Sequence, residues 1–128
     1  MFSVVIAENE LRIANGYPAQ QNEFPFLVSL RRNGGHFCGG SLISQKHVLT
    51  AAHCIHDYVE NPRYHNMRSL RAYVGTNYLN RGGTPYGIKK ITYHSSYVHH
   101  SKRSNIFMPN DIAILLVGKF IVLIYLLF

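Results

Sequence analysis

Short runs of apolar residues, separated by glycine, proline and asparagine, dominate the pattern of the chain. Parts of these runs alternate apolar and polar side chains, which is typical of strands with one buried face. The first two runs flank Asn33, Gly34 and Gly35, a turn signal that predicts a hairpin. The predicted strands are Phe24–Arg32, His36–Ser44, His47–Cys54, Ser69–Thr76, Tyr86–His94 and Asp111–Val117.

Two of these runs depart from plain alternation. His47–Cys54 is expected to begin as a strand and to end in a short helical turn. Asp111–Val117 is continuously apolar after its aspartate, which is consistent with a strand buried on both faces. No segment of helical period is long enough to predict a substantial helix. Short strands at this spacing predict an all-β barrel or sandwich, with Asn61–Ser69 and Ser95–Asn110 as long surface loops.

The composition changes after Val117. The tail, residues 118–128, ends in nine consecutive apolar residues, Phe120–Phe128. A helix needs about twenty such residues to span a bilayer, so these nine are too few by themselves. As an exposed segment the tail has the composition of an aggregation-prone strand.

The size and charge of the chain narrow the classes of function. A chain of 128 residues with 47% apolar and 15% charged residues fits one globular domain. Thirteen Lys and Arg against six Asp and Glu give a formal charge of +7. The basic residues are scattered and no run reaches five, so we expect a solvated basic surface and no nucleic-acid partner.

The cysteines and the N-terminus do not by themselves identify the cellular compartment. The chain has two cysteines, Cys38 and Cys54, and an even count suggests a pair without identifying the redox environment. Residues 1–12 begin with a mostly apolar stretch of about seven residues but lack the basic start of a secretory signal. We interpret this segment as a remnant signal or pro-segment, with a plain N-terminus as the alternative.

Several short motifs occur together in one order. They are "RIANG" at Arg12–Gly16, "FPFLVSL" at Phe24–Leu30, "FCGGSLIS" at Phe37–Ser44, "VLTAAHC" at Val48–Cys54 and "NDIAILL" at Asn110–Leu116. In these motifs the chain resembles the trypsin- and chymotrypsin-like serine proteases. The resemblance covers Arg12 to Val117 and implies the first of that family's two six-stranded Greek-key barrels, residues 13–117.

The resemblance implies catalytic roles for two residues that composition and pattern would leave as ordinary polar positions. His53 is the general base and then the general acid, and Asp111 accepts the other ring N–H and stabilises the imidazolium. A bridge between Cys38 and Cys54 would tie the segment that carries His53 to a neighbouring strand. It would close a loop of about 17 residues and contribute roughly 3 kcal/mol in the chain-entropy model.

An activation site also follows from the resemblance. In the family, cleavage before an Ile or Val frees an α-amino group that pairs with an aspartate beside the nucleophile. Here the cleavage would fall between Arg12 and Ile13, which makes the chain a zymogen. Ala14 and Tyr17 depart from the residues that are usual in the family, and a plain surface loop is the alternative.

The resemblance also implies partners that the 128 residues do not contain. The family takes its nucleophilic serine from a "GDSGG"-type segment in the second barrel, and no such segment occurs here, while Ser41 lies within a predicted strand. The oxyanion hole and the specificity pocket belong to the same half. We therefore expect a truncated, secreted endopeptidase chain that is inactive alone, exposes an apolar barrel interface and needs no cofactor. Its full-length relatives would act on proteins or peptides and bind protease inhibitors.

Three alternatives stay open at this stage. The chain could be a non-catalytic binding module that keeps only its surface loops. It could be membrane-associated through Ile112–Phe128, although Lys119 would cost about 2.5–3.5 kcal/mol near the middle of a span. A metal site is the third, but its residues lack a recognised ligand spacing and we interpret them as solvated loop histidines. These residues are His53, His56, His94, His99 and His100.

Overall fold

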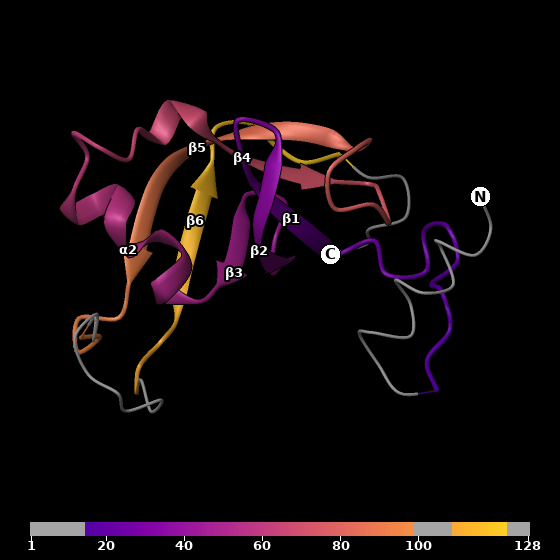
Figure 1. The fold of residues 1–128 in the computed structure, drawn as a ribbon, viewed down its shortest axis with the longest axis horizontal. Coiled ribbons are helices and arrows are strands. Elements are labelled where there is room, and N and C mark those ends of the chain that lie inside the picture. Colours follow the sequence, from indigo (N-terminus) through magenta and orange to yellow (C-terminus); the bar gives the residue numbers. More distant parts are fainter. Residues whose placement is uncertain (1–14, 99–108, 123–128) are drawn as a thin grey trace.

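The computed structural model describes residues 15–98 and 109–122 of the chain. Six antiparallel strands close into one barrel in the spatial order β1, β2, β3, β6, β5, β4 (Figure 1). The strands are β1 (Leu27–Arg32), β2 (Gly35–Leu42), β3 (His47–Thr50), β4 (Leu70–Val74), β5 (Thr84–Tyr93) and β6 (Ala113–Val117). A helix, α2 (Ala52–Glu60), follows β3, and a short 3₁₀ helix, η1 (Met67–Ser69), leads into β4. The predicted all-β barrel is confirmed.

Side chains that alternate along the strands fill the barrel. Every second residue of β4 and of β6 is buried, so each strand turns one face to the core. Burying one large aliphatic side chain stabilises the fold by about 1.5–3 kcal/mol. The largest fully buried side chains are Leu30, Val48, Ile55, Leu70, Val74, Leu115, Val117 and Ile121.

The predicted hairpin is present. β1 pairs with β2, and Arg32 lies opposite Gly35 at the end of the ladder. Asn33 and Gly34 form the turn with φ of 50° and 85°. Positive φ at both central residues matches the twist of the two strands, and asparagine and glycine are the residues that adopt it most readily.

α2 is longer than the short helical turn that the sequence predicted, so that prediction was wrong. The helix has nine residues and buries Ala52, Ile55 and Tyr58. Three apolar positions spread over two and a half turns are too few to show a helical period in the sequence. The Tyr93 hydroxyl donates a hydrogen bond to the Glu60 carboxylate, which ties the end of α2 to β5.

The last strand also differs from its prediction. β6 begins at Ala113 rather than Asp111, and it is not buried on both faces. Ala113, Leu115 and Val117 are buried, whereas the Ile114 side chain is 37% exposed. The continuous apolar run therefore reflects an apolar outer face of the barrel and not a second core.

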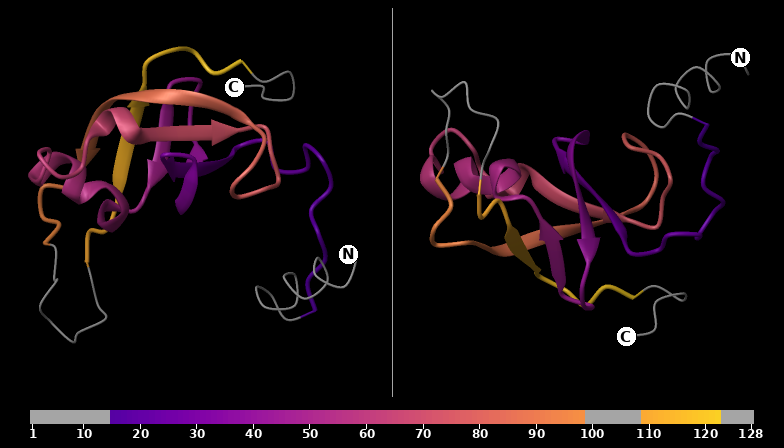
Figure 2. Two further views of the ribbon diagram at one scale, coloured as in Figure 1. Left: turned by 45° about the horizontal axis from the view of Figure 1, so that its top comes forward. Right: turned by 90° about the horizontal axis from the view of Figure 1, so that it is seen from below.

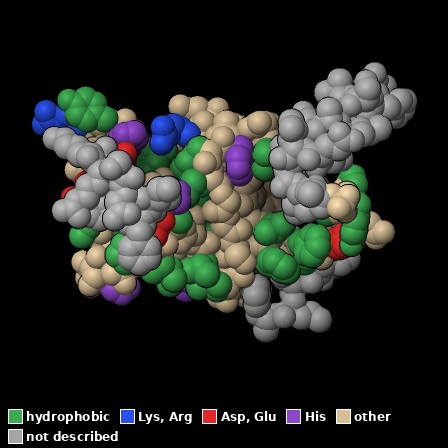
Figure 3. All heavy atoms as spheres, turned by 60° about the horizontal axis from the view of Figure 1, so that its bottom comes forward, with side chains coloured by type: hydrophobic (Ala, Val, Ile, Leu, Met, Phe, Trp, Pro, Cys, Tyr) green, Lys and Arg blue, Asp and Glu red, His purple; other side chains and the backbone are tan. Residues whose placement is uncertain are grey.

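Apolar side chains are exposed on the barrel surface, as expected for one barrel by itself. Some lie in the segment before β1 and others around β6. The space-filling view shows hydrophobic side chains gathered in several groups on one such face (Figure 3). The exposed set includes Phe24, Phe26, Leu27, Ile43, Ile112 and Ile114.

Some predicted features lie outside the described residues. These are the 1–12 segment, the Arg12–Ile13 junction, His99 and His100, and the last part of the tail from residue 123. Across residues 15–98 and 109–122, no helix has the length and apolar character needed to cross a membrane. Two further views of the ribbon show the helix α2 lying beside one end of the barrel (Figure 2).

Candidate active site

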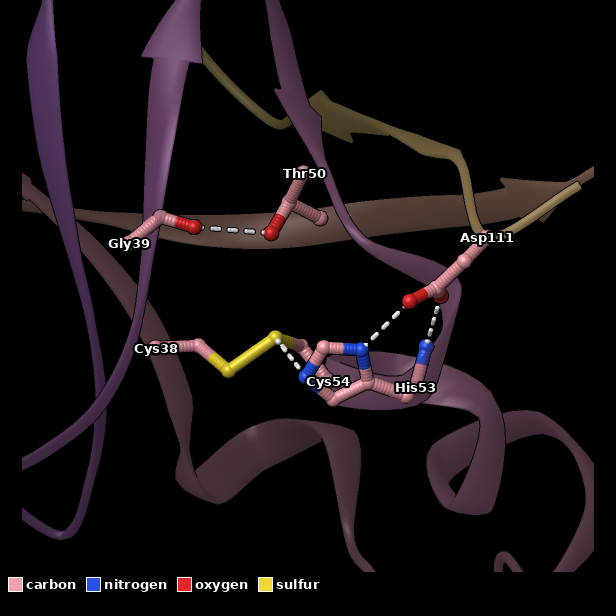
Figure 4. Close-up of polar contacts among 6 residues, drawn as sticks. All are labelled: Cys38, Gly39, Thr50, His53, Cys54 and Asp111. Carbon is pink, nitrogen blue, oxygen red and sulfur yellow. Dashed lines mark hydrogen bonds and ion pairs between the residues drawn. A yellow bond between two sulfur atoms is a disulfide. The ribbon is translucent and has the colours of Figure 1, made fainter. Parts of the chain in front are cut away.

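His53 and Asp111 come together where two paired strands meet a helix. β3 pairs with β6, and Thr50 at the end of β3 lies opposite Ala113 at the start of β6. His53 follows β3 in the first turn of α2, and Asp111 precedes β6. The strand register therefore brings two residues that are 58 positions apart into contact (Figure 4).

The Asp111 carboxylate uses both of its oxygens on His53. Oδ2 lies 2.6 Å from the ring Nδ1, and Oδ1 accepts a hydrogen bond of 2.8 Å from the His53 backbone N–H. The N-cap residue of α2, Ala51, provides no side-chain cap. From the segment just before β6, Asp111 therefore acts as the N-cap of α2 and places its negative charge at the positive end of the helix dipole.

The same contacts set the ionisation of Asp111. Partial burial acts to raise the pKa of this carboxyl group. Hydrogen bonds from the His53 ring and backbone N–H, the charge of His53 and the Ala52 backbone N–H act in the opposite direction and outweigh it. The net pKa is lowered, so Asp111 is a carboxylate at neutral pH and the ring nitrogen that faces it carries the proton.

A disulfide joins Cys38 of β2 to Cys54 of α2, next to His53. The expected pairing is confirmed, and the bridge holds the first turn of α2 against the strand (Figure 4). The second ring nitrogen, Nε2, lies 3.7 Å from Cys54 Sγ. A disulfide sulfur has no proton to donate to the lone pair of Nε2, so this contact leaves Nε2 available to a true donor.

The ring is open to approach from outside. The His53 side chain is 46% exposed and the Asp111 side chain 20%. Among the described residues, no serine hydroxyl contacts the His53 ring. Ser41 lies within β2, as expected. Two other histidines do contact serines, His36 with Ser29 and His47 with Ser44, and both do so through Nδ1.

Sequence analysis did not single out two residues that lie near the pair. The Thr50 hydroxyl donates a 2.8 Å hydrogen bond to the Gly39 carbonyl oxygen, which ties β3 to β2 just before α2 (Figure 4). Tyr97 is buried, and its pKa is raised by burial and then by the negative charges of Asp111 and Asp57. The "TAAHC" motif contained the signal for Thr50, whereas nothing in the sequence singled out Tyr97.

The histidines that we considered for a metal site do not form one in the described part of the chain. His56 packs against the Tyr93 and Tyr97 rings, at 5.5 and 5.6 Å between centroids, so it is not a solvated loop residue. The one described group with metal-ligand proximity is Cys38, His53 and Cys54. Both of its sulfurs are in the disulfide, so they cannot act as thiolate ligands.

Comparisons with known proteins agree with these motifs. The sequence model of a family described as Trypsin matches residues 13–119. Hypodermin-A of Hypoderma lineatum is 34% identical over 102 residues, trypsin epsilon of Drosophila erecta 36% over 103, and lectizyme of Glossina austeni 38% over 109. The alignments cover 80%, 80% and 84% of this chain but 37%, 35% and 35% of these relatives. The chain thus spans little more than a third of their length.

Proposed function

Because the chain belongs to the trypsin family of serine proteases, we propose that it forms the N-terminal barrel of a serine endopeptidase. His53 supplies the general base and acid, and Asp111 positions it. The nucleophile and the oxyanion hole come from a second barrel of the kind that completes the family fold. The observation that carries the proposal is the double contact of one Asp111 carboxylate with the His53 ring and backbone.

The roles follow from where the protons lie. Asp111 holds the proton on Nδ1, which leaves the lone pair on Nε2. Nε2 accepts the serine proton while the serine oxygen bonds to the carbonyl carbon of the peptide. It then donates that proton to the departing amine, and a water molecule repeats the sequence to release the acid. Imidazole suits both steps because it exchanges protons near neutral pH.

The 128-residue chain by itself does not carry out this reaction. Its sequence contains no "GDSGG"-type segment, so no hydroxyl is provided for the Nε2 of His53 to activate. Without the nucleophile no acyl-enzyme forms, however well the base is placed. The exposed apolar side chains near β1 and β6 are the surface against which a second barrel packs.

Location, activation and partners belong to the same proposal. The protein acts in an oxidising, extracellular compartment, and the Cys38–Cys54 disulfide supports this. Proteins or peptides are its substrates, and protease inhibitors bind at the same active site. Cleavage after Arg12 frees the amino group of Ile13, and the start of the family match at residue 13 supports this junction.

A fluorophosphonate probe tests the proposal in two arms. The chain alone should remain unlabelled; stoichiometric labelling would refute the absence of a nucleophile.

In the second arm, residues 13–117 are joined to the second barrel of trypsin epsilon. This chimera should be labelled at the serine of that barrel and should hydrolyse casein. His53→Ala should abolish both activities, while His56→Ala, a matched change on the same helix, should not. A chimera whose activity survives His53→Ala would refute the role of His53.

A further inference from the structure

A groove of about 600 Å³ lies between the first half of β5 and the segment that follows β6. β5 pairs with β6 only from Ile88 onward, because β6 ends at Val117. The chain then turns away, and the Gly118 N–H donates to the Gly87 carbonyl oxygen at the end of the ladder. The groove is lined by residues 84–89 and 118–120.

Positive charge surrounds this groove. Lys89 and Lys119 line it, and the ammonium of Lys46 lies 4.4 Å from the centre of the Phe120 ring. No carboxylate lines the groove, and in the described part of the chain none pairs with these lysines. The described carboxylates lie elsewhere, in the segment before β1, on α2 and beside His53; they are Glu23, Asp57, Glu60 and Asp111. The groove therefore attracts anions without competition from the described carboxylates.

The floor and wall of the groove are apolar. Tyr86 and Ile88 are half-buried there, and the Phe120 ring is 61% exposed. Pro85 also lines the groove and has no N–H to pair with an added strand. A ligand is therefore held by side chains more than by main-chain pairing. Apolar surface within a cationic rim fits a polypeptide better than a sulfated polysaccharide, which has no apolar side chains to bury.

The groove lies at the opposite end of β5 and β6 from the candidate active site. Tyr93 pairs with Ala113 near Asp111, whereas Ile88 pairs with Val117 near the groove (Figure 1). At the usual rise per strand residue, the chain from Asp111 to Gly118 spans roughly 20 Å. A partner in the groove thus leaves His53 open.

We propose that this groove binds an acidic polypeptide segment that carries an aromatic or aliphatic side chain between its acidic residues. The apolar side chain packs on Phe120 and Ile88, and the flanking carboxylates face Lys89 and Lys119. This binding site is separate from the proposed peptidase chemistry, and it does not need the nucleophile. It can therefore be tested on the full 128-residue chain.

Fluorescence anisotropy with a labelled peptide, EEFEEIE, measures the binding. Lys89→Gln with Lys119→Gln should weaken it at least about fivefold, since two exposed charge contacts are lost. The matched pair Lys90→Gln with Arg63→Gln removes the same charge outside the groove and should change the binding affinity less than about twofold.

A Cβ at Gly87 meets no atom within 4 Å, so the position accepts a side chain. Gly87→Glu should abolish binding, and Gly87→Ala should preserve it.

The other classes of ligand give different results. Phe120→Ala should weaken EEFEEIE but not the all-polar peptide EEGEEGE. If a heparin oligosaccharide binds more tightly than EEFEEIE and Phe120→Ala has no effect, the site is a polysaccharide site and the proposal is wrong. Equal loss in the groove pair and the matched pair would show attraction by net charge alone, which also overturns it.

Discussion

The Asp111 carboxylate holds both the ring and the backbone of His53, at 2.6 Å from Nδ1 and 2.8 Å from the peptide nitrogen. One side chain thus orients the imidazole and caps the helix that carries it. Because Ala51 offers no capping side chain, the start of α2 depends on a residue 58 positions away. The stability of this end of the barrel and the geometry of the candidate site are therefore linked.

Replacing Asp111 should destabilise the fold more than replacing another acid of the same region. Asp111→Ala leaves the backbone N–H of His53 without its acceptor and should lower the free energy of unfolding by about 2–3 kcal/mol. Asp111→Asn keeps an acceptor oxygen and should cost about half of that. The comparison is Asp57→Ala on α2, whose partly exposed carboxylate makes only weak contacts with His56 and His65, and we expect a change within about 0.5 kcal/mol. Urea unfolding measures all three, and equal midpoints for Asp111→Ala and Asp57→Ala would contradict the capping role.

The lowered pKa of Asp111 predicts how stability depends on pH. A carboxyl group with a lower pKa in the folded state stabilises the fold in its ionised form. The contribution is fully present above the unfolded-state pKa of about 3.9 and is lost as the pH falls through the lower folded-state pKa. Unfolding midpoints of the wild type and Asp111→Asn should therefore converge at the acid end. A difference that stays constant down to the lowest pH would contradict the assigned cause.

The disulfide should stabilise the barrel by an amount that depends on the logarithm of the loop length it closes. Cys38 and Cys54 are 16 positions apart, and a loop of this size is worth about 3 kcal/mol in the chain-entropy model. The double variant Cys38→Ser with Cys54→Ser should lower the guanidinium midpoint accordingly. Adding a reductant should shift the wild type to the same midpoint and leave the variant unchanged. If reduction moves neither protein, the bridge does not stabilise this barrel.

The two glycines of "FCGGSLIS" should respond differently to alanine. A Cβ on Gly40 would lie 2.8 Å from Val48 Cγ1 and 3.0 Å from the Leu49 carbonyl oxygen. Gly40→Ala should therefore cost about 1–3 kcal/mol, because the core cannot absorb it without a shift. A Cβ on Gly39 meets only the Val28 carbonyl oxygen, at 4.0 Å, so Gly39→Ala serves as the matched control and should be neutral or slightly stabilising. Thermal unfolding of the two variants gives the comparison, and a Gly39→Ala variant that loses as much would refute it.

Local pattern predicted the strands and the hairpin, because these depend on neighbouring residues. Arg31 illustrates what pattern cannot predict. Its side chain is 3% exposed, and its guanidinium donates to the carbonyl oxygens of Tyr78, Arg81 and Gly82. A basic residue on an outward strand position is expected to be solvated. It is buried here because a loop about 50 positions away folds over it, and the sequence around Arg31 contains no sign of that loop.

Some residues of the candidate site could likewise be predicted from the sequence, and others could not. The motifs pointed to His53, Asp111 and the cysteine pair, since these residue types occur at characteristic positions. The capping of α2 by Asp111 depends on the pairing of β3 with β6, which places a carboxylate at a helix start. The burial of Tyr97 depends on its packing against His56 and Tyr93. Such contacts form only when the barrel has assembled. They therefore cannot be predicted from the sequence of any one segment.

The tautomer of His53 distinguishes a peptidase base held by a carboxylate from an ordinary surface histidine. Nitrogen-15 NMR of the histidine rings distinguishes a protonated Nδ1 from a protonated Nε2. In the neutral ring, we expect His53 to carry its proton on Nδ1 with Nε2 unprotonated, and Asp111→Asn to shift the proton toward Nε2. His47, which contacts Ser44 rather than a carboxylate, provides the internal control and should not change. A wild-type His53 protonated on Nε2, or a tautomer unaffected by Asp111→Asn, would contradict the assignment of His53 and Asp111 as a peptidase base and its positioning carboxylate.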